Sequence, residues 1–170
     1  GLANRRSLRE FLQRAWPRAR RATSPLAIVM IDLDHFKPVN DNFGHVAGDR
    51  VLAGVAEALK SHIRASDLAC RYGGEEFALV LPDATLDAVR RRAEDIQHAI
   101  RQFRPQHRGR FLGSITASFG VAMFPDHAQD PESLLRAADQ ALYQAKAAGR
   151  DRIVVSSARP ASPDAARQTA

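Results

Sequence analysis

Apolar residues recur along the chain in two spacings. The helical spacing marks four segments, at about residues 4–16, 49–63, 86–103 and 131–148. Short apolar runs or strict alternation predict strands at residues 26–31, 68–71, 77–81, 115–123 and 153–155. Strands and helices alternate, with two strands adjacent in the middle. The pattern therefore predicts one α/β sandwich whose strands run in mixed directions.

Helix-breaking residues set the expected boundaries. Asn4 is expected to cap the first helix, which Pro17 and then Pro25 bring to an end. Pro, Asn and Gly recur at residues 36–48, which predicts a loop before the second helix. Residues 104–113 are predicted to form a basic loop, and Gly73-Gly74 to form a hairpin turn. The Ala-, Ser- and Pro-rich residues 156–170 are expected to form a disordered tail behind a domain at 1–155.

Composition narrows the class of protein. The chain has 170 residues, 45% of them hydrophobic and 26% charged, which suits one globular domain with its own core. No apolar run reaches the roughly 20 residues that span a bilayer, and no signal peptide is visible. The single cysteine, Cys70, excludes an intrachain disulfide and an all-cysteine metal cage. This usage fits a reducing cytoplasm.

The net charge of +6 lies in the first 25 residues, which hold seven arginines and one acid, Glu10. A basic segment of this kind can bind nucleic acid, an anionic membrane or an acidic partner domain. Apolar residues at helical spacing put the arginines on the opposite, solvated face of a helix, which is the simpler interpretation. No aromatic set is interleaved for stacking on bases, so we expect no nucleic-acid partner.

Two acidic pairs are the strongest chemical signal. Asp32 and Asp34 end a buried strand, where residues two apart share a face. Glu75 and Glu76 follow the Gly-Gly turn. If these strands are neighbours, Asp32 and Glu75 form a carboxylate cluster for a hard divalent ion such as magnesium. The alternative is that all four acids are ordinary turn residues.

Basic and amide side chains supply candidate nucleotide contacts. Lys146 and Arg150 are four residues apart at a helix end, so they share a face and suit a triphosphate. Asn40 and Asp49 can read a guanine edge, although a turn and a helix N-cap are their alternative roles. Lys37 and Arg71 are further candidates, although basic residues such as these four are more often surface charges. No P-loop motif is present.

Five ordered motifs resemble the GGDEF domain over about residues 1–155. The first signature is MIDLDHFKPVND at 30–41, continued by FGH at 43–45 and GD at 48–49. RYGGEEF at 71–77 resembles the namesake loop in its GGEEF form. SFGVA at 118–122, DQALYQAK at 139–146 with Gly149-Arg150, and GLANRR at 1–6 are similar to the other blocks.

The resemblance implies a fold and an activity. The expected fold is α/β (α+β), a central mixed, mainly antiparallel five-stranded sheet flanked by helices, as in nucleotidyl cyclases and the polymerase palm. GGDEF domains are diguanylate cyclases, which condense two GTP into cyclic di-GMP and release two pyrophosphates. One domain holds one GTP, so the resemblance implies a homodimer. It also implies two Mg²⁺ or Mn²⁺ ions per active half-site.

The resemblance assigns roles to residues of this chain according to their positions in the motifs. The metal ligands would be Asp32, the Leu33 carbonyl and Glu75, with Glu76 supporting the second ion. Catalysis would fall to Glu75, which helps to activate the 3′-hydroxyl, together with Glu76 and Asp32. The remaining substrate contacts would be Asn40 and Asp49 to guanine, Lys37, Lys146 and Arg150 to phosphates, and Phe36 and Gly74.

An inhibitory site is implied by a further match. Arg64-Ala65-Ser66-Asp67 stands where the family carries an RxxD site that binds cyclic di-GMP as an intercalated dimer. Arg64 would contact a phosphate or guanine edge and Asp67 a guanine. An arginine from the next helix often assists, and Arg90, Arg91 and Arg92 are equal candidates. The alternative is that this quartet is surface charge.

Gly1 opens the chain inside the family's first motif. We therefore expect a fragment of a longer cytoplasmic protein, or of the cytoplasmic part of a membrane-bound sensor, with an upstream sensor or dimerisation domain. Two alternatives to an active cyclase remain at this stage. One is a catalytically silent receptor for GTP or cyclic di-GMP, and the other is a cyclase that makes a different dinucleotide.

Overall fold

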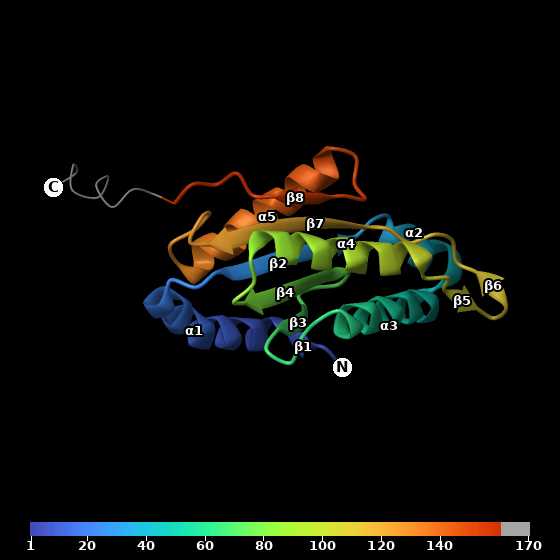
Figure 1. Ribbon diagram of the computed structural model, residues 1–170. Coiled ribbons are helices and arrows are strands. Elements are labelled where there is room, and N and C mark those ends of the chain that lie inside the picture. Colours follow the sequence, from blue (N-terminus) through green and yellow to red (C-terminus); the bar gives the residue numbers. More distant parts are fainter. Residues whose placement is uncertain (161–170) are drawn as a thin grey trace.

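A computed structural model describes residues 1–160 of the chain and shows a sheet covered by helices on both faces (Figure 1). The sheet order is β1-β3-β4-β2-β7-β8. The β1–β3 and β7–β8 pairs are parallel and the other three pairs are antiparallel. The strands of this sheet are β1 (Ala3–Asn4), β2 (Leu26–Leu33), β3 (Leu68–Arg71), β4 (Glu76–Pro82), β7 (Ala117–Phe124) and β8 (Ile153–Val155).

Strand β2 lies at the centre of the sheet, between β4 and β7. Every residue of β2 is buried, which explains its continuous apolar run. Its alternate residues Ala27, Val29 and Ile31 join the core on one face, and Ile28 and Met30 join the core on the other. The mixed, mainly antiparallel sheet is as expected from the sequence.

Two helices pack on each face of the sheet. The first core holds the apolar stripes of α3 and α4, and the second holds those of α1 and α5. A short helix, α2, precedes α3. The helices are α1 (Arg5–Ala22), α2 (Phe36–Phe43), α3 (His45–Ser61), α4 (Leu86–Gln102) and α5 (Pro131–Ala147). Within residues 1–160, no helix combines the length and apolar character needed to cross a membrane.

The structure confirms the predicted start of the first helix and corrects its end. Asn4 caps α1 as predicted, because its side chain accepts a hydrogen bond from the Ser7 amide at 2.9 Å. Pro17 does not end the helix, which continues to Ala22. A proline inside a helix costs about 3 kcal/mol, and burial of Trp16 and Ala19 on either side of it offsets that cost.

The segment predicted as a loop, residues 36–48, is helical. It forms α2 and the first turn of α3, broken only at Gly44, whose φ is 83°. Pro38 falls in the first turn of α2, where its missing N–H is tolerated. Phe36 and Val39 are buried, and this burial outweighs the weak helix propensity of the segment.

Three smaller expectations also need correction. The sheet has six strands rather than five, because Ala3–Asn4 adds β1 at its edge. The basic loop at 104–113 contains a two-stranded hairpin, β5 (Gln106–His107) with β6 (Arg110–Phe111), which projects at one end of the molecule (Figure 1). The predicted tail begins on the fold, since buried Ser156 bonds to the Val121 carbonyl. Its residues 161–170 lie outside the described residues.

Candidate active site

Charged side chains from four separate segments meet at the end of β2. They line an open cleft of about 300 Å³. Asp32 comes from β2, Glu75 from the β3–β4 hairpin, Lys146 from the last turn of α5 and Arg150 from the turn after it. Phe36 and Lys37, at the start of α2, complete the rim. The structure thus brings the two predicted acidic sites together.

Asp32 is held against a cation. It is 8% exposed, and its Oδ2 lies 2.9 Å from Nζ of Lys146. A buried carboxylate is costly without such a partner. Lys146 reaches it because α5 packs across β7 and β2, whose residues Asp32 and Ser118 face each other in the ladder. An anionic and a cationic group are therefore in direct contact in this cleft.

The hairpin that carries Glu75 is fixed by its own arginine. The Arg71 Nε and Nη2 donate to the Gly74 carbonyl at 3.1 and 2.8 Å. The Leu33 amide donates to the Glu75 carbonyl at 3.3 Å, which joins the turn to the end of β2. Burial, followed by the charge of Asp32, raises the pKa of Glu75. From the sequence alone Arg71 was only a candidate charge, and the structure adds this contact with the turn.

Of the other predicted site residues, Glu76 and Gly74 are outside the lining of this cleft and Lys37 is on its rim. Glu76 is not among its lining residues, and its carboxylate lies over Gly73, 2.7 Å from where a Cβ would be. Gly74 is exposed, with open space at its Cβ position. Lys37 is exposed and pairs with Asp41 at 2.9 Å, a contact that raises the pKa of its ammonium group.

A second cleft of about 380 Å³ contains Asp49. Its floor is apolar, formed by Leu2, Leu52 and Phe77 among others, and Arg71 lies at its edge. Asp49 is exposed and lies inside α3, five residues into the helix, so its alternative role as an N-cap is wrong. The signature hairpin borders both clefts, since Arg71 lines this one and Glu75 the other.

Asn40 lies against Gly48, the residue before Asp49, because α2 packs on the first turn of α3. A Cβ at Gly48 would be 1.9 Å from Oδ1 of Asn40 and 3.1 Å from Cζ of Phe36. Glycine is therefore the residue that lets the Asn40 amide come this close to α3. An amide, a carboxylate and an apolar floor together suit a flat base with donors and acceptors on its edge.

Asp34 does not share the cleft chemistry of Asp32, although it also borders the opening. It is 7% exposed, and its carboxylate accepts hydrogen bonds from Thr116, Ser118 and the amide of Asp151. These contacts occupy three of about four acceptor sites of the carboxylate with structural partners. The sequence could not separate Asp32 from Asp34, because their partners lie more than 80 residues away.

The donor set fits a magnesium-like ion that relies on its substrate for ligands. In the described part of the chain, no three His, Cys, Asp or Glu side chains gather into a metal cage. Asp32, Leu33 and Glu75 border one opening. Magnesium is held by one or two carboxylates, with waters and phosphates completing the shell. This cleft offers that arrangement.

The Arg64–Asp67 quartet lies in the turn before β3. Asp67 is buried, and its carboxylate accepts from the Arg64 amide at 2.8 Å and is ion-paired with Arg92. Arg64 itself is exposed. Of the three arginines that the sequence left equivalent, the structure places Arg92 against Asp67, whereas Arg90 and Arg91 are exposed.

Comparisons with known proteins agree with this geometry. The family described as "Diguanylate cyclase, GGDEF domain" matches residues 1–152. The chain is 43% identical over 156 residues to the response regulator PleD of Caulobacter vibrioides, covering 91% of this chain and 34% of PleD. It thus spans about a third of that relative's length.

Solved structures show the same fold. The GGDEF domain of DgcB from Caulobacter crescentus, in complex with c-di-GMP, superposes with a TM-score of 0.84 at 34% identity and covers 91% of each chain. The active GGEEF domain of a diguanylate cyclase from Vibrio cholerae gives a TM-score of 0.83 at 35% identity, over 92% of this chain and 98% of that one.

Proposed function

The chain belongs to the GGDEF family of diguanylate cyclases, and we propose that it condenses two GTP into cyclic di-GMP with release of two pyrophosphates. The observation that carries the proposal is the convergence of Asp32, Glu75 and Lys146 on one cleft, next to a second cleft that holds Asp49. A polar cleft for phosphates beside an apolar one for a base matches the two halves of a nucleotide.

The proposed substrate contacts follow from the side chains in each cleft. The Asn40 amide donates to guanine O6, and the Asp49 carboxylate accepts from guanine N1–H and N2–H₂. Lys146 and Arg150 bind the triphosphate, and their charges oppose the negative charge that grows on the leaving pyrophosphate. Lys37 joins them once it leaves Asp41. Phe36 and Gly74 form the walls along the nucleotide.

The proposed reaction joins two nucleotides held by two copies of the domain. The 3′-oxygen of one GTP bonds to the α-phosphorus of the other, while the bond from that phosphorus to the pyrophosphate breaks. The 3′-hydroxyl proton passes to the Glu75 carboxylate. In the metal-free protein, burial and the charge of Asp32 raise the pKa of Glu75. A second transfer in the opposite sense closes the ring, so the active state is a homodimer.

Two Mg²⁺ or Mn²⁺ ions would be held at Asp32, the Leu33 carbonyl and Glu75, with Glu76 turning from Gly73 to support the second. When bound, such ions lower the pKa of the attacking hydroxyl and neutralise the leaving group. Lys146 then passes from Asp32 to the triphosphate. The chain's own contribution is to keep the carboxylates and the cations on opposite sides of the substrate.

The expected product is cyclic di-GMP when the concentrated protein is incubated with GTP and Mg²⁺ and the products are separated by chromatography and mass spectrometry. ATP in excess should not compete, because Asp49 reads hydrogens that adenine does not carry at those positions. Cyclic dinucleotide from ATP would indicate a different cyclase.

A silent receptor is the second candidate function. It is favoured by the exposed Arg64, whose backbone amide shares the Asp67 carboxylate with Arg92. Cyclic di-GMP binding without turnover, even in protein dimerised by a fused coiled coil, would replace the cyclase proposal with this one.

Product inhibition is proposed at the Arg64–Asp67 quartet, with Arg92 as its third member. Arg64→Ala is expected to raise the cyclic di-GMP concentration for half-inhibition about tenfold or more, because a charge-assisted contact to phosphate is worth about 1.5–3 kcal/mol. Initial rates measured with added cyclic di-GMP test this. Arg90→Ala, which removes an exposed arginine without a place beside Asp67, is the control. Equal inhibition of wild type and Arg64→Ala would make the quartet surface charge.

The proposed setting is cytoplasmic, where GTP is supplied, with a sensor or dimerisation domain in the longer protein. PleD, of which the chain spans about a third, is named a response regulator. The arginines of α1 lie around a buried face that packs on the sheet, which supports a solvated helix rather than a nucleic-acid surface.

A further inference from the structure

The turn after α5 has an unusual backbone. Its three consecutive residues Gly149, Arg150 and Asp151 have φ values of 115°, 62° and 45°. Glycine adopts this left-handed region freely, but arginine and aspartate do so at a cost. Residues in such conformations persist only where their surroundings over-determine them, and they cluster at functional sites. Arg150 lines the phosphate cleft.

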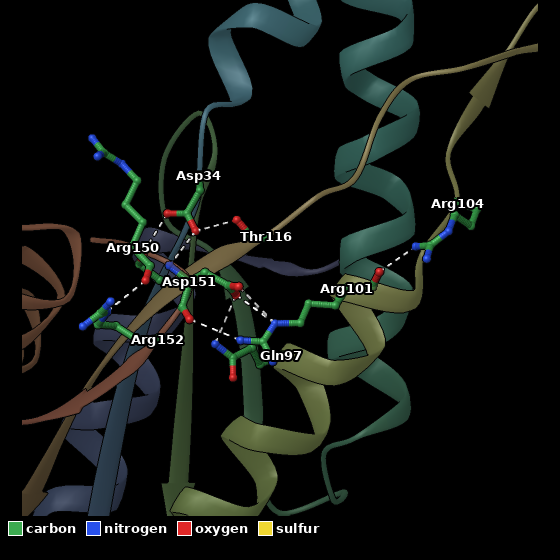
Figure 2. A network of polar contacts seen from close by, with 9 residues as sticks. Asp34, Gln97, Arg101, Arg104, Thr116, Arg150, Asp151 and Arg152 are labelled. Atoms are coloured by element: carbon green, nitrogen blue, oxygen red, sulfur yellow. Dashed lines mark hydrogen bonds and ion pairs between the residues drawn. The ribbon is translucent and has the colours of Figure 1, made fainter. Parts of the chain in front are cut away.

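Asp151 is bonded at every polar group it has (Figure 2). Its amide donates to Oδ2 of Asp34 at 3.0 Å, and its carbonyl accepts from Nη2 of Arg101 at 3.2 Å. Its carboxylate accepts from Nε of Arg101 at 3.0 and 3.2 Å and from Nε2 of Gln97 at 3.3 Å. The backbone of this residue therefore has little freedom to leave its conformation.

The partners of Asp151 are anchored in the rigid part of the fold. Gln97 and Arg101 stand one turn apart on α4, and Gln97 is 8% exposed. Asp34 is itself held by the hydroxyl groups of Thr116 at 2.8 Å and Ser118 at 2.7 Å. Hydrogen bonds from α4, the end of β2 and β7 thus converge on one exposed turn.

We propose that this network holds Arg150 in the conformation that binds the triphosphate, with Arg101 and Asp34 as positioning residues. The inference rests on the proposed function. The side chain of Arg150 extends away from the network, while its backbone is fixed by Asp151 on one side and by Arg152, whose Nε donates to the Arg150 carbonyl at 3.0 Å, on the other (Figure 2). Asp34 thereby acts on Arg150 through the turn, by its hydrogen bond from the Asp151 amide.

Arg101→Ala is expected to loosen the turn and to weaken triphosphate binding alone. The probe is 3′-deoxy-GTP with Mg²⁺, which lacks the attacking hydroxyl and so stays intact, compared with GMP, which lacks the β- and γ-phosphates. If Arg150 keeps its binding conformation about one tenth of the time, affinity for 3′-deoxy-GTP falls about tenfold. Affinity for GMP should stay within about twofold, and amide exchange at Asp151 should accelerate.

Three variants sharpen the comparison. Arg90→Ala removes the same charge from an exposed position earlier on α4 and should change nothing. Arg101→Lys keeps the charge without the planar fork and should fall between wild type and Arg101→Ala. In the Arg150→Ala background, Arg101→Ala should cost no further affinity, because the group it positions is gone.

Each contrary result has its own meaning. Unchanged amide exchange at Asp151 in Arg101→Ala would overturn the claim that Arg101 holds the turn. Faster exchange with unchanged 3′-deoxy-GTP affinity, equal losses for GMP and 3′-deoxy-GTP, or an additive loss with Arg150→Ala would overturn the link to the triphosphate. Absence of 3′-deoxy-GTP binding by wild type would instead overturn the proposed function, while the exchange measurement would still decide whether Arg101 holds the turn.

Discussion

Glu75→Gln is expected to lower cyclic di-GMP formation by about a thousandfold or more. The carboxylate has two proposed tasks, which are to accept the 3′-hydroxyl proton and to hold a metal ion, and the amide performs neither. Loss of the proton acceptor alone costs about 10²–10⁴ in rate, and several kcal/mol of transition-state charge stabilisation are lost with the ion. The measurement is the initial rate with GTP and Mg²⁺. Asp32→Ala should be equally inactive.

The same substitution should leave the metal-free protein at least as stable as wild type at pH 7. Burial and the charge of Asp32 raise the pKa of Glu75 in the folded state, so above the pKa of the unfolded chain the ionised carboxylate favours unfolding. Glutamine removes that charge. The difference should vanish as the pH falls and Glu75 becomes neutral in both states. Thermal unfolding at several pH values measures this.

Glu94→Gln is the matched control, because it makes the same chemical change at an exposed residue of α4. It should retain full activity. Turnover in Glu75→Gln within tenfold of wild type would remove Glu75 from the reaction. A large loss of stability in Glu75→Gln would mean that inactivity reports misfolding.

Local patterns were sufficient to predict the scaffold. The buried run of β2 and the Gly-Gly hairpin are properties of neighbouring residues, and their placement followed from spacing alone. The meeting of Asp32 with Glu75 was also predictable in outline. It needed only the assumption that two strands are neighbours, and β2 and β4 do pair.

Features that depend on tertiary contact were not predictable. Helix α2 forms against local propensity because Phe36 and Val39 are buried, and α1 passes through Pro17 because its apolar face is covered. The roles of Asp34 and Arg101 depend on partners 117 and 50 residues away. Spacing along the chain carries no signal for such pairs, so they required the structure.

Gly120→Ala is expected to destabilise the fold by about 3 kcal/mol or more. A Cβ at this position would lie 2.2 Å from the Ala138 carbonyl oxygen, 2.2 Å from the Leu142 amide nitrogen and 2.8 Å from the Leu142 Cα. These are backbone atoms of α5, so no side-chain rotation can make room. The helix would have to move away from β7, the strand on which it packs most extensively.

Gly74→Ala is the matched control for stability, since no atom lies within 4 Å of its Cβ position and the same methyl group would enter open space. In thermal unfolding, a loss of 3 kcal/mol corresponds to a decrease in Tm of about 10 °C for a domain of this size. Gly74→Ala should change Tm by far less, and equal Tm values for both variants would refute the clash.

Because Gly120 lies under α5, which carries Lys146, the same substitution should also affect the active site. Displacing α5 from β7 would carry Lys146 away from Asp32, since the two ends of that 2.9 Å ion pair lie on α5 and β2. Gly120→Ala should therefore lose GTP turnover at temperatures where it is still folded. A variant with a lowered Tm but wild-type turnover at low temperature would show that α5 can shift without moving Lys146, and that the cleft tolerates movement of the helix that carries its cations.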